Sequence, residues 1–193
     1  MAAVMLAAVD IGNVCIQLQV EKSNRAFGYS GELPVAFTTL TEQYETGKIG
    51  TVEFLKKMSA VTGLSEAAAK LAWELKLGSE MPGMADAIRD FAAKGVEFVF
   101  LSDIGELHLT AVRRNVSFVN FFKGGIFSFE AGVCKPDHRI FRTFEDTYGK
   151  PAVFFDDLEK NIKSASEFGW NAVQFTGADM FRETMNQLLS GNH

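Results

Sequence analysis

The chain has 193 residues, 47% hydrophobic and 22% charged, a composition typical of one compact globular domain rather than a disordered chain. Its net charge of −5 argues against nucleic acid as a partner, because an acidic protein does not attract polyanions. Two cysteines cannot form a disulfide framework, so we predict a cytoplasmic protein. Separately, we expect a monomer or a homodimer. Residues 1–9 are all apolar, but Asp10 ends this run and no basic residue precedes it. We therefore expect neither a signal peptide nor a membrane span.

Short apolar runs recur along the chain and predict buried strands. They lie at residues 3–9, 96–101, 125–129, 152–155 and 171–175. Continuous apolar runs of this length are typical of strands that are buried on both faces of a parallel sheet. Segments with helical periodicity, each closely followed by a glycine, lie between them at 84–94, 137–148 and 159–168. This alternation predicts an α/β fold with a Rossmann-like parallel sheet.

Residues 16–80 break the alternation of strands and helices. We expect helices over 34–46, 51–62 and 65–77, with Thr51 and Ser65 as N-caps, and we find no strand pattern in this segment. The sequence therefore predicts a small all-helical cap at 16–80, inserted after the first strand. The remaining segments, 1–15 and 81–193, would form the core.

Polar residues with possible chemical roles follow four of the predicted strands. They are Asp10, Ser102, Lys135 and the pair Asp156–Asp157. Each also has an ordinary structural explanation, as a helix cap, a turn residue or a solvated charge. Because ligands of open α/β sheets bind outside the carboxyl ends of the strands, we expect the set to converge. Together a carboxylate nucleophile, phosphate-binding groups and metal-binding acids favour phosphoryl transfer through an aspartyl-phosphate.

Four segments also resemble the motifs of the haloacid dehalogenase (HAD) superfamily of hydrolases, in order and in spacing. They are VDIGNV, LSD, KPDHRIF and FFDDLEKNI. The segment QYETGKI resembles part of a small helical cap in that superfamily, and the first motif is similar to that of the alpha-D-glucose-1-phosphate phosphatase subgroup. The resemblance implies a HAD-like core and hydrolysis of a small phosphorylated metabolite, with a sugar phosphate as one candidate.

The resemblance also implies a role for each motif residue. Asp10 would attack phosphorus, while Ser102 and Lys135 would hold the phosphoryl group. Lys135 would also screen Asp10 from Asp157. The implied Mg²⁺ site consists of Asp10, the backbone carbonyl of Gly12, Asp157 and, in the first or second shell, Asp156.

Two residues depart from the pattern of the superfamily. Gly12 stands where most of its phosphatases have an aspartate that acts as general acid and base, a function worth about 10²–10⁴-fold in rate. Asp103 follows Ser102, where many relatives have asparagine. We place Asp103 among the substrate-binding residues, where its charge would weaken anion binding unless it points away.

These departures leave two alternatives to a Mg²⁺-dependent phosphatase. One is a relative with weak or no catalysis that binds a phosphometabolite or a protein partner. The other is a metal-independent 2-haloacid dehalogenase, against which the Asp156–Asp157 pair argues. We predict structural or solvated roles for Cys15, Trp73, His108 and Cys134.

Overall fold

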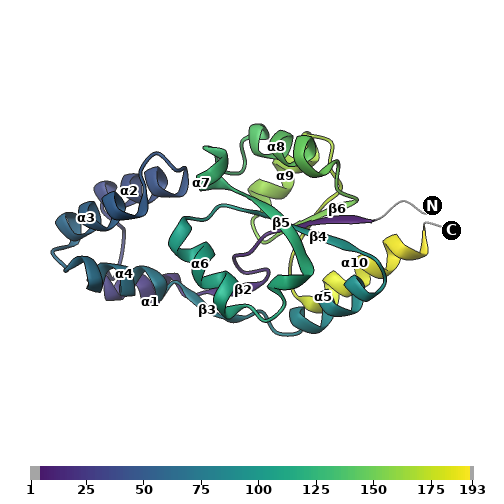
Figure 1. Ribbon diagram of the computed structural model, residues 1–193, viewed down its shortest axis with the longest axis horizontal. Helices are drawn as coiled ribbons and strands as arrows, with labels where there is room; N and C mark the ends of the chain where they lie inside the picture. The colour runs from purple at the N-terminus through teal and green to yellow at the C-terminus, as the bar shows by residue number, and fades with distance from the viewer. Residues whose placement is uncertain (1–4, 192–193) are drawn as a thin grey trace.

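A computed structural model describes residues 5–191, and a five-stranded parallel sheet lies at its centre (Figure 1). The strand order is β5-β4-β1-β6-β7, and every neighbouring pair is parallel. The strands are β1 (Leu6–Val9), β4 (Glu97–Ser102), β5 (Phe122–Phe127), β6 (Val153–Asp156) and β7 (Ala172–Gln174). The predicted α/β class and parallel sheet are confirmed. Residues 3 and 4 of the first predicted strand lie outside the described part of the chain.

Helices cover both faces of this sheet, which explains why the strands are continuously apolar. Val9 and Phe100 belong to the hydrophobic cluster on one face, and their neighbours Ala8 and Leu101 belong to the cluster on the other. The first face packs against α5 (Met84–Ala93), α6 (Glu106–Asn115) and α10 (Ala178–Ser190). The second packs against α8 (His138–Tyr148) and α9 (Glu159–Glu167). The turns η1 (Val119–Phe121) and α7 (Ser128–Ala131) flank β5.

Four further helices pack together beyond the carboxyl ends of the strands, and we use the name cap for this group (Figure 1). They are α1 (Val20–Ala26), α2 (Val35–Glu45), α3 (Thr51–Thr62) and α4 (Glu66–Glu74). The cap has its own aromatic core, in which the Tyr44 and Phe54 rings stack with centroids 4.0 Å apart and Trp73 meets Phe54 edge to face. Leu107 of α6 also packs against this core, so the cap is anchored to the helix that follows β4.

The prediction that residues 16–80 contain no strands was wrong. Strand β2 (Ile16–Leu18) pairs antiparallel with β3 (Leu77–Glu80) where the chain enters and leaves the cap. The helix expected to reach residue 77 therefore ends at Glu74. Both strands are short and mostly half-buried, so they leave no apolar alternation in the sequence.

The strand expected at 125–129 is also shifted. It begins earlier, at Phe122, and Ser128 starts the short helix α7. Strand β5 lies at the edge of the sheet, so its first half is less buried and reads as polar. Within residues 5–191, no helix has both the length and the apolar character that a membrane span requires.

Candidate active site

The central strands bring the predicted polar residues to one edge of the sheet. Asp10 follows β1, where its backbone N–H donates to Phe155 O at 2.9 Å, and Ser102 is the last residue of β4. Asp156 ends β6, and Lys135 reaches the same place from the loop between α7 and α8. Because β1 lies between β4 and β6, the carboxyl ends of these strands converge, as the sequence pattern predicts.

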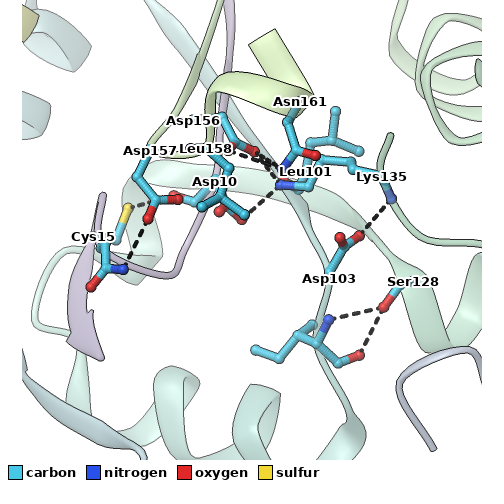
Figure 2. A network of polar contacts seen from close by, with 12 residues as sticks. Asp10, Cys15, Leu101, Asp103, Ser128, Lys135, Asp156, Asp157, Leu158 and Asn161 are labelled. Carbon is cyan, nitrogen blue, oxygen red and sulfur yellow. Dashed lines mark hydrogen bonds and ion pairs between the residues drawn. The ribbon is translucent and has the colours of Figure 1, made fainter. Parts of the chain in front are cut away.

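Lys135 is the electrostatic centre of this cluster (Figure 2). Its buried Nζ lies 3.0 Å from Asp10 Oδ1 and 2.6 Å from Asp156 Oδ2, and it donates to Leu101 O at 3.0 Å. Burial acts to lower the pKa of Lys135, but Asp10 and Asp156 outweigh burial and hold the pKa above its usual value. The lysine therefore stays charged and keeps two acids close together.

Asp10 is the acid most affected by this environment. Burial raises the pKa of Asp10 to about 7, against the opposing attraction of Lys135. Asp156 raises the same pKa further, and a hydrogen bond from Ser102 lowers it. Apart from the Lys135 ammonium, no group within residues 5–191 satisfies Asp10 Oδ1. This buried oxygen is therefore free to react or to bind a cation.

The two adjacent acids after β6 have different surroundings. Asp156 is fully buried, and its oxygens accept from Lys135 Nζ, from Leu158 N at 2.8 Å and from Asn161 Nδ2 at 3.0 Å. Asp157 is only half-buried, and its Oδ2 accepts from Asn13 Nδ2 at 2.9 Å. Asp157 thus has more lone pairs available for a ligand than Asp156.

Three carboxylates in this cluster could hold a metal ion. Asp10, Asp156 and Asp157 each offer an oxygen within 4.8 Å of the others. An oxygen-only set that includes the unsatisfied Asp10 Oδ1 fits a hard divalent cation such as Mg²⁺ or Ca²⁺. Such a cation would also compensate the negative charge that Lys135 balances only in part.

The two departures from the superfamily pattern lie beside this cluster. A Cβ atom on Gly12 would lie 2.9 Å from Leu18 Cδ1, so the β2 side chain fills the space there. Asp103 Oδ1 accepts the backbone N–H of Lys135 at 2.9 Å, and burial raises the pKa of Asp103. Its carboxylate therefore fixes the loop that carries Lys135.

Among the residues expected to be structural, Cys15 lies beside the cluster, where its buried Sγ donates to Asp10 O at 3.3 Å. His108 is buried, its ring stacks on Trp73, and its Nε2 donates to Trp73 O at 2.8 Å. Burial raises the pKa of Cys15 well above its usual value and that of Cys134 to about 11, so both thiols stay protonated.

Two asparagines in the cluster were missed by sequence reasoning. Asn161 lies five residues after Asp156 on α9, a spacing that the fourth motif contains and that could have revealed it. Asn13 contacts Asp157 across 144 positions of sequence, and no local pattern indicates that contact.

Comparison with solved structures identifies the fold. A HAD family enzyme from Bacteroides thetaiotaomicron superimposes with a TM-score of 0.81 at 24% identity, over 93% of this chain and 98% of the other. The chain has the haloacid dehalogenase-like fold. A predicted HAD-like family hydrolase from Porphyromonas gingivalis shares this fold with a TM-score of 0.79 at 22% identity, covering 97% and 98% of the two chains.

More distant structures have the same HAD-like fold. L-2-haloacid dehalogenase from Xanthobacter autotrophicus matches with a TM-score of 0.63 at 14% identity, over 98% of this chain and 84% of its own. No protein-family model and no curated protein matches the sequence. The fold that the four short motifs indicate is therefore found over almost the whole chain.

Proposed function

We propose that this protein is a Mg²⁺-dependent phosphatase that hydrolyses a small phosphomonoester through an aspartyl-phosphate on Asp10. The observation that carries the proposal is the buried Asp10 carboxylate, 3.0 Å from the Lys135 ammonium and beside Asp156 and Asp157. A HAD family enzyme of the same fold, with a TM-score of 0.77 at 21% identity, has been solved with magnesium and inorganic phosphate. A sugar phosphate is one candidate substrate.

In the proposed reaction, an Asp10 oxygen attacks phosphorus and the bond between phosphorus and the alcohol oxygen breaks. That oxygen takes its proton from solvent, because Gly12 carries no acid. Water then cleaves the acyl phosphate, releasing inorganic phosphate and the free Asp10 carboxylate. Ser102 and Lys135 hold the phosphoryl oxygens throughout.

A Mg²⁺ site would be formed by Asp10, the Gly12 carbonyl and Asp157, with Asp156 in support. When bound, Mg²⁺ supplies positive charge between the nucleophile and the phosphate, two groups that otherwise repel each other. The Lys135 ammonium favours the ionised form of the Asp10 carboxylate, against the effect of burial, and orients its unsatisfied oxygen. The same ammonium separates Asp10 from Asp156, with which it makes its shortest contact.

The test measures phosphate release from para-nitrophenyl phosphate and a panel of sugar phosphates, with Mg²⁺ and with EDTA. Asp10→Asn keeps the size of the side chain but removes the nucleophile, and we expect it to lower the rate by about 10³-fold or more. Asp146→Asn, at an exposed acid on α8, is the matched control and should leave the rate unchanged. An unchanged rate in Asp10→Asn would contradict the proposal.

The same panel separates the two alternative functions. Turnover of 2-chloropropionate that survives EDTA would favour a dehalogenase, the activity named for the Xanthobacter structure. A folded protein that binds phosphate but never releases it from an ester would favour a binding role, with Gly12 as the decisive departure.

We further propose that residues 16–80 act as a cap over the site and select the substrate. The separate aromatic core of these helices and their place beyond the carboxyl ends of the strands support this role. A cytoplasmic location and a monomeric or homodimeric state stay predictions. The location rests on the low cysteine content, and both cysteines are free in the structure.

A further inference from the structure

Asn13 makes two side-chain contacts that join distant parts of the molecule. Its Nδ2 donates to Asp157 Oδ2 at 2.9 Å, and its Oδ1 accepts the backbone N–H of Leu18 at 3.0 Å. Asp157 follows β6 in the core, whereas Leu18 ends β2 and pairs with Leu77 of β3 at the base of the cap. One amide group thus bridges a candidate metal ligand and the strand pair that leads into the cap.

The backbone around Asn13 is built to present this amide. Asn13 has a φ of 51°, a left-handed conformation that asparagine adopts more readily than most residues. Its N–H donates to Ile16 O at 2.7 Å, and Cys15 N and Ile16 N both donate to Ile11 O. The turn is therefore fixed by its own backbone, which leaves the Asn13 side chain free to reach outward.

The orientation of the Asp157 side chain depends on its hydrogen bond from Asn13, whereas the neighbouring Asp156 has several partners. Asp156 is oriented by Lys135, Leu158 and Asn161, whereas within residues 5–191 Asn13 supplies the one hydrogen bond made to the Asp157 carboxylate. The other contact to this residue, from Gln174 Nε2 at 3.0 Å, goes to its backbone carbonyl. Without Asn13, the half-buried Asp157 side chain would be free to turn away from Asp10.

We propose that Asn13 is a positioning residue that holds Asp157 in its metal-binding orientation and couples that orientation to the base of the cap. This inference rests on the proposed Mg²⁺ site. A bound cation would fix Asp157, Asp157 would fix the Asn13 amide, and the amide would in turn hold the N–H of Leu18. By reciprocity, order at β2 would strengthen metal binding.

The test variant is Asn13→Gly, because glycine adopts the left-handed backbone without strain and removes only the side chain. Asn13→Ala would mix the loss of the amide with backbone strain. The matched control is Gln174→Ala, which removes another amide donor to Asp157 but leaves the carboxylate untouched. Mg²⁺ affinity is measured by titration calorimetry on the protein alone, without substrate.

We expect Asn13→Gly to weaken Mg²⁺ binding by about 10-fold, the size of effect seen when a partner of a metal ligand is removed. Gln174→Ala should stay within about twofold of the wild type. Hydrogen exchange supplies the second readout: Mg²⁺ should slow exchange of the Leu18 amide in the wild type and not in Asn13→Gly.

A purely structural Asn13 would lower the unfolding midpoint of Asn13→Gly and leave its Mg²⁺ affinity unchanged, and that result would overturn the inference. A wild-type protein that binds no Mg²⁺ would overturn it as well. Failure of the proposed phosphatase activity can be told apart from failure of this inference. If the protein binds Mg²⁺ in an Asn13-dependent way but releases no phosphate, the role of Asn13 is supported and the phosphatase activity is contradicted.

Discussion

Gly12 determines how the leaving oxygen is protonated in the proposed reaction. No side chain at position 12 can donate a proton, and the space next to it is filled by Leu18, with Cδ1 2.9 Å from a Cβ built there. The contacting atom is the end of a flexible side chain, so Leu18 can rotate to admit a larger residue. If the proposed reaction holds, the site would suit esters whose alcohol leaves without a proton donor, and an acid could be added at position 12 once Leu18 has rotated.

Gly12→Asp should raise phosphate release from a simple alkyl phosphate by about 10-fold, a part of the usual gain from general acid catalysis. Para-nitrophenyl phosphate should gain little, because its phenolate leaves without a proton. The measurement is kcat/KM for both substrates. Gly12→Asn, which has the same size and no acidic proton, is the control, and an equal gain in both variants would contradict the explanation.

Lys135 separates two buried acids, so its loss should destabilise the fold. In Lys135→Met, Asp10 and Asp156 face each other without a cation, and we expect a loss of about 3–5 kcal/mol in the free energy of unfolding. Burial already raises the pKa of Asp10 from 3.8 to about 7, and losing the lysine raises it further. When a carboxyl has a higher pKa in the folded state than in the unfolded state, the free energy of unfolding decreases as the pH rises. The stability lost in Lys135→Met relative to the wild type should therefore be largest near pH 8 and smaller near pH 5.

Urea unfolding at both pH values measures this deficit. The double variant Lys135→Met/Asp10→Asn should recover part of the loss, because it removes one of the two charges that repel. A deficit that is the same at pH 5 and pH 8, and is not rescued by the second substitution, would show that Lys135 acts through packing alone.

At the scale of elements, α6 connects the sheet to the cap. Helix α6 begins after Gly105, and a Cβ there would clash with Tyr44 Cε1 on α2. The Tyr44 hydroxyl accepts the N–H of Leu107 at 2.9 Å and shares a hydrogen bond with Thr51 Oγ1 at 3.1 Å. Gly105 has a φ of −97°, so the need for glycine here is one of space and not of backbone conformation.

Gly105→Ala should therefore destabilise the protein by about 1–3 kcal/mol, the usual cost of overpacking. Gly50→Ala is a matched control, because Gly50 also caps a helix, α3, and a Cβ there meets nothing within 4 Å. The difference between the two variants in urea unfolding isolates the contact with Tyr44 from the capping effect. Equal losses in both would contradict the account.

Much of this architecture could be predicted from sequence, because its signals are local. Buried parallel strands are apolar throughout, as in Phe98–Leu101, and a polar residue directly after such a strand marks the carboxyl edge. Strands β2 and β3 could not be predicted, since they are short and half-buried and are stabilised by pairing with each other. The Asn13–Asp157 contact was hidden for the same reason: it exists only after distant segments have folded together.

At the scale of the whole molecule, cap and sheet meet at a buried histidine. His108 on α6 donates to Trp73 O at the end of α4, and the two rings stack with centroids 4.7 Å apart. Burial lowers the pKa of His108 to about 3, and the nearby Lys76 acts in the same direction. The folded protein therefore keeps this ring neutral, whereas the unfolded chain protonates it near its usual pKa of 6.5.

This difference makes the joint between cap and sheet sensitive to acid. Below pH 6.5 the unfolded chain binds a proton that the folded protein does not bind. The free energy of unfolding therefore decreases as the pH is lowered, down to about pH 3. At pH 5 the loss due to His108 should be about 2 kcal/mol relative to neutral pH, since each pKa unit corresponds to 1.36 kcal/mol. Asp10, whose pKa is raised, contributes in the opposite direction over part of this range, so a variant must isolate the histidine.

His108→Gln retains an amide donor for Trp73 O but has no group that titrates. Its free energy of unfolding, measured in urea at pH 7.5 and pH 5.0, should fall less on acidification than that of the wild type. His138→Gln, the same substitution at an exposed histidine, is the control for replacing histidine by glutamine. If His108→Gln and the wild type lost equal stability between the two pH values, the acid sensitivity would have to come from groups other than His108. If the free energy of unfolding changes less between the two pH values in His108→Gln alone, the neutral His108 between α4 and α6 is the source of the acid sensitivity.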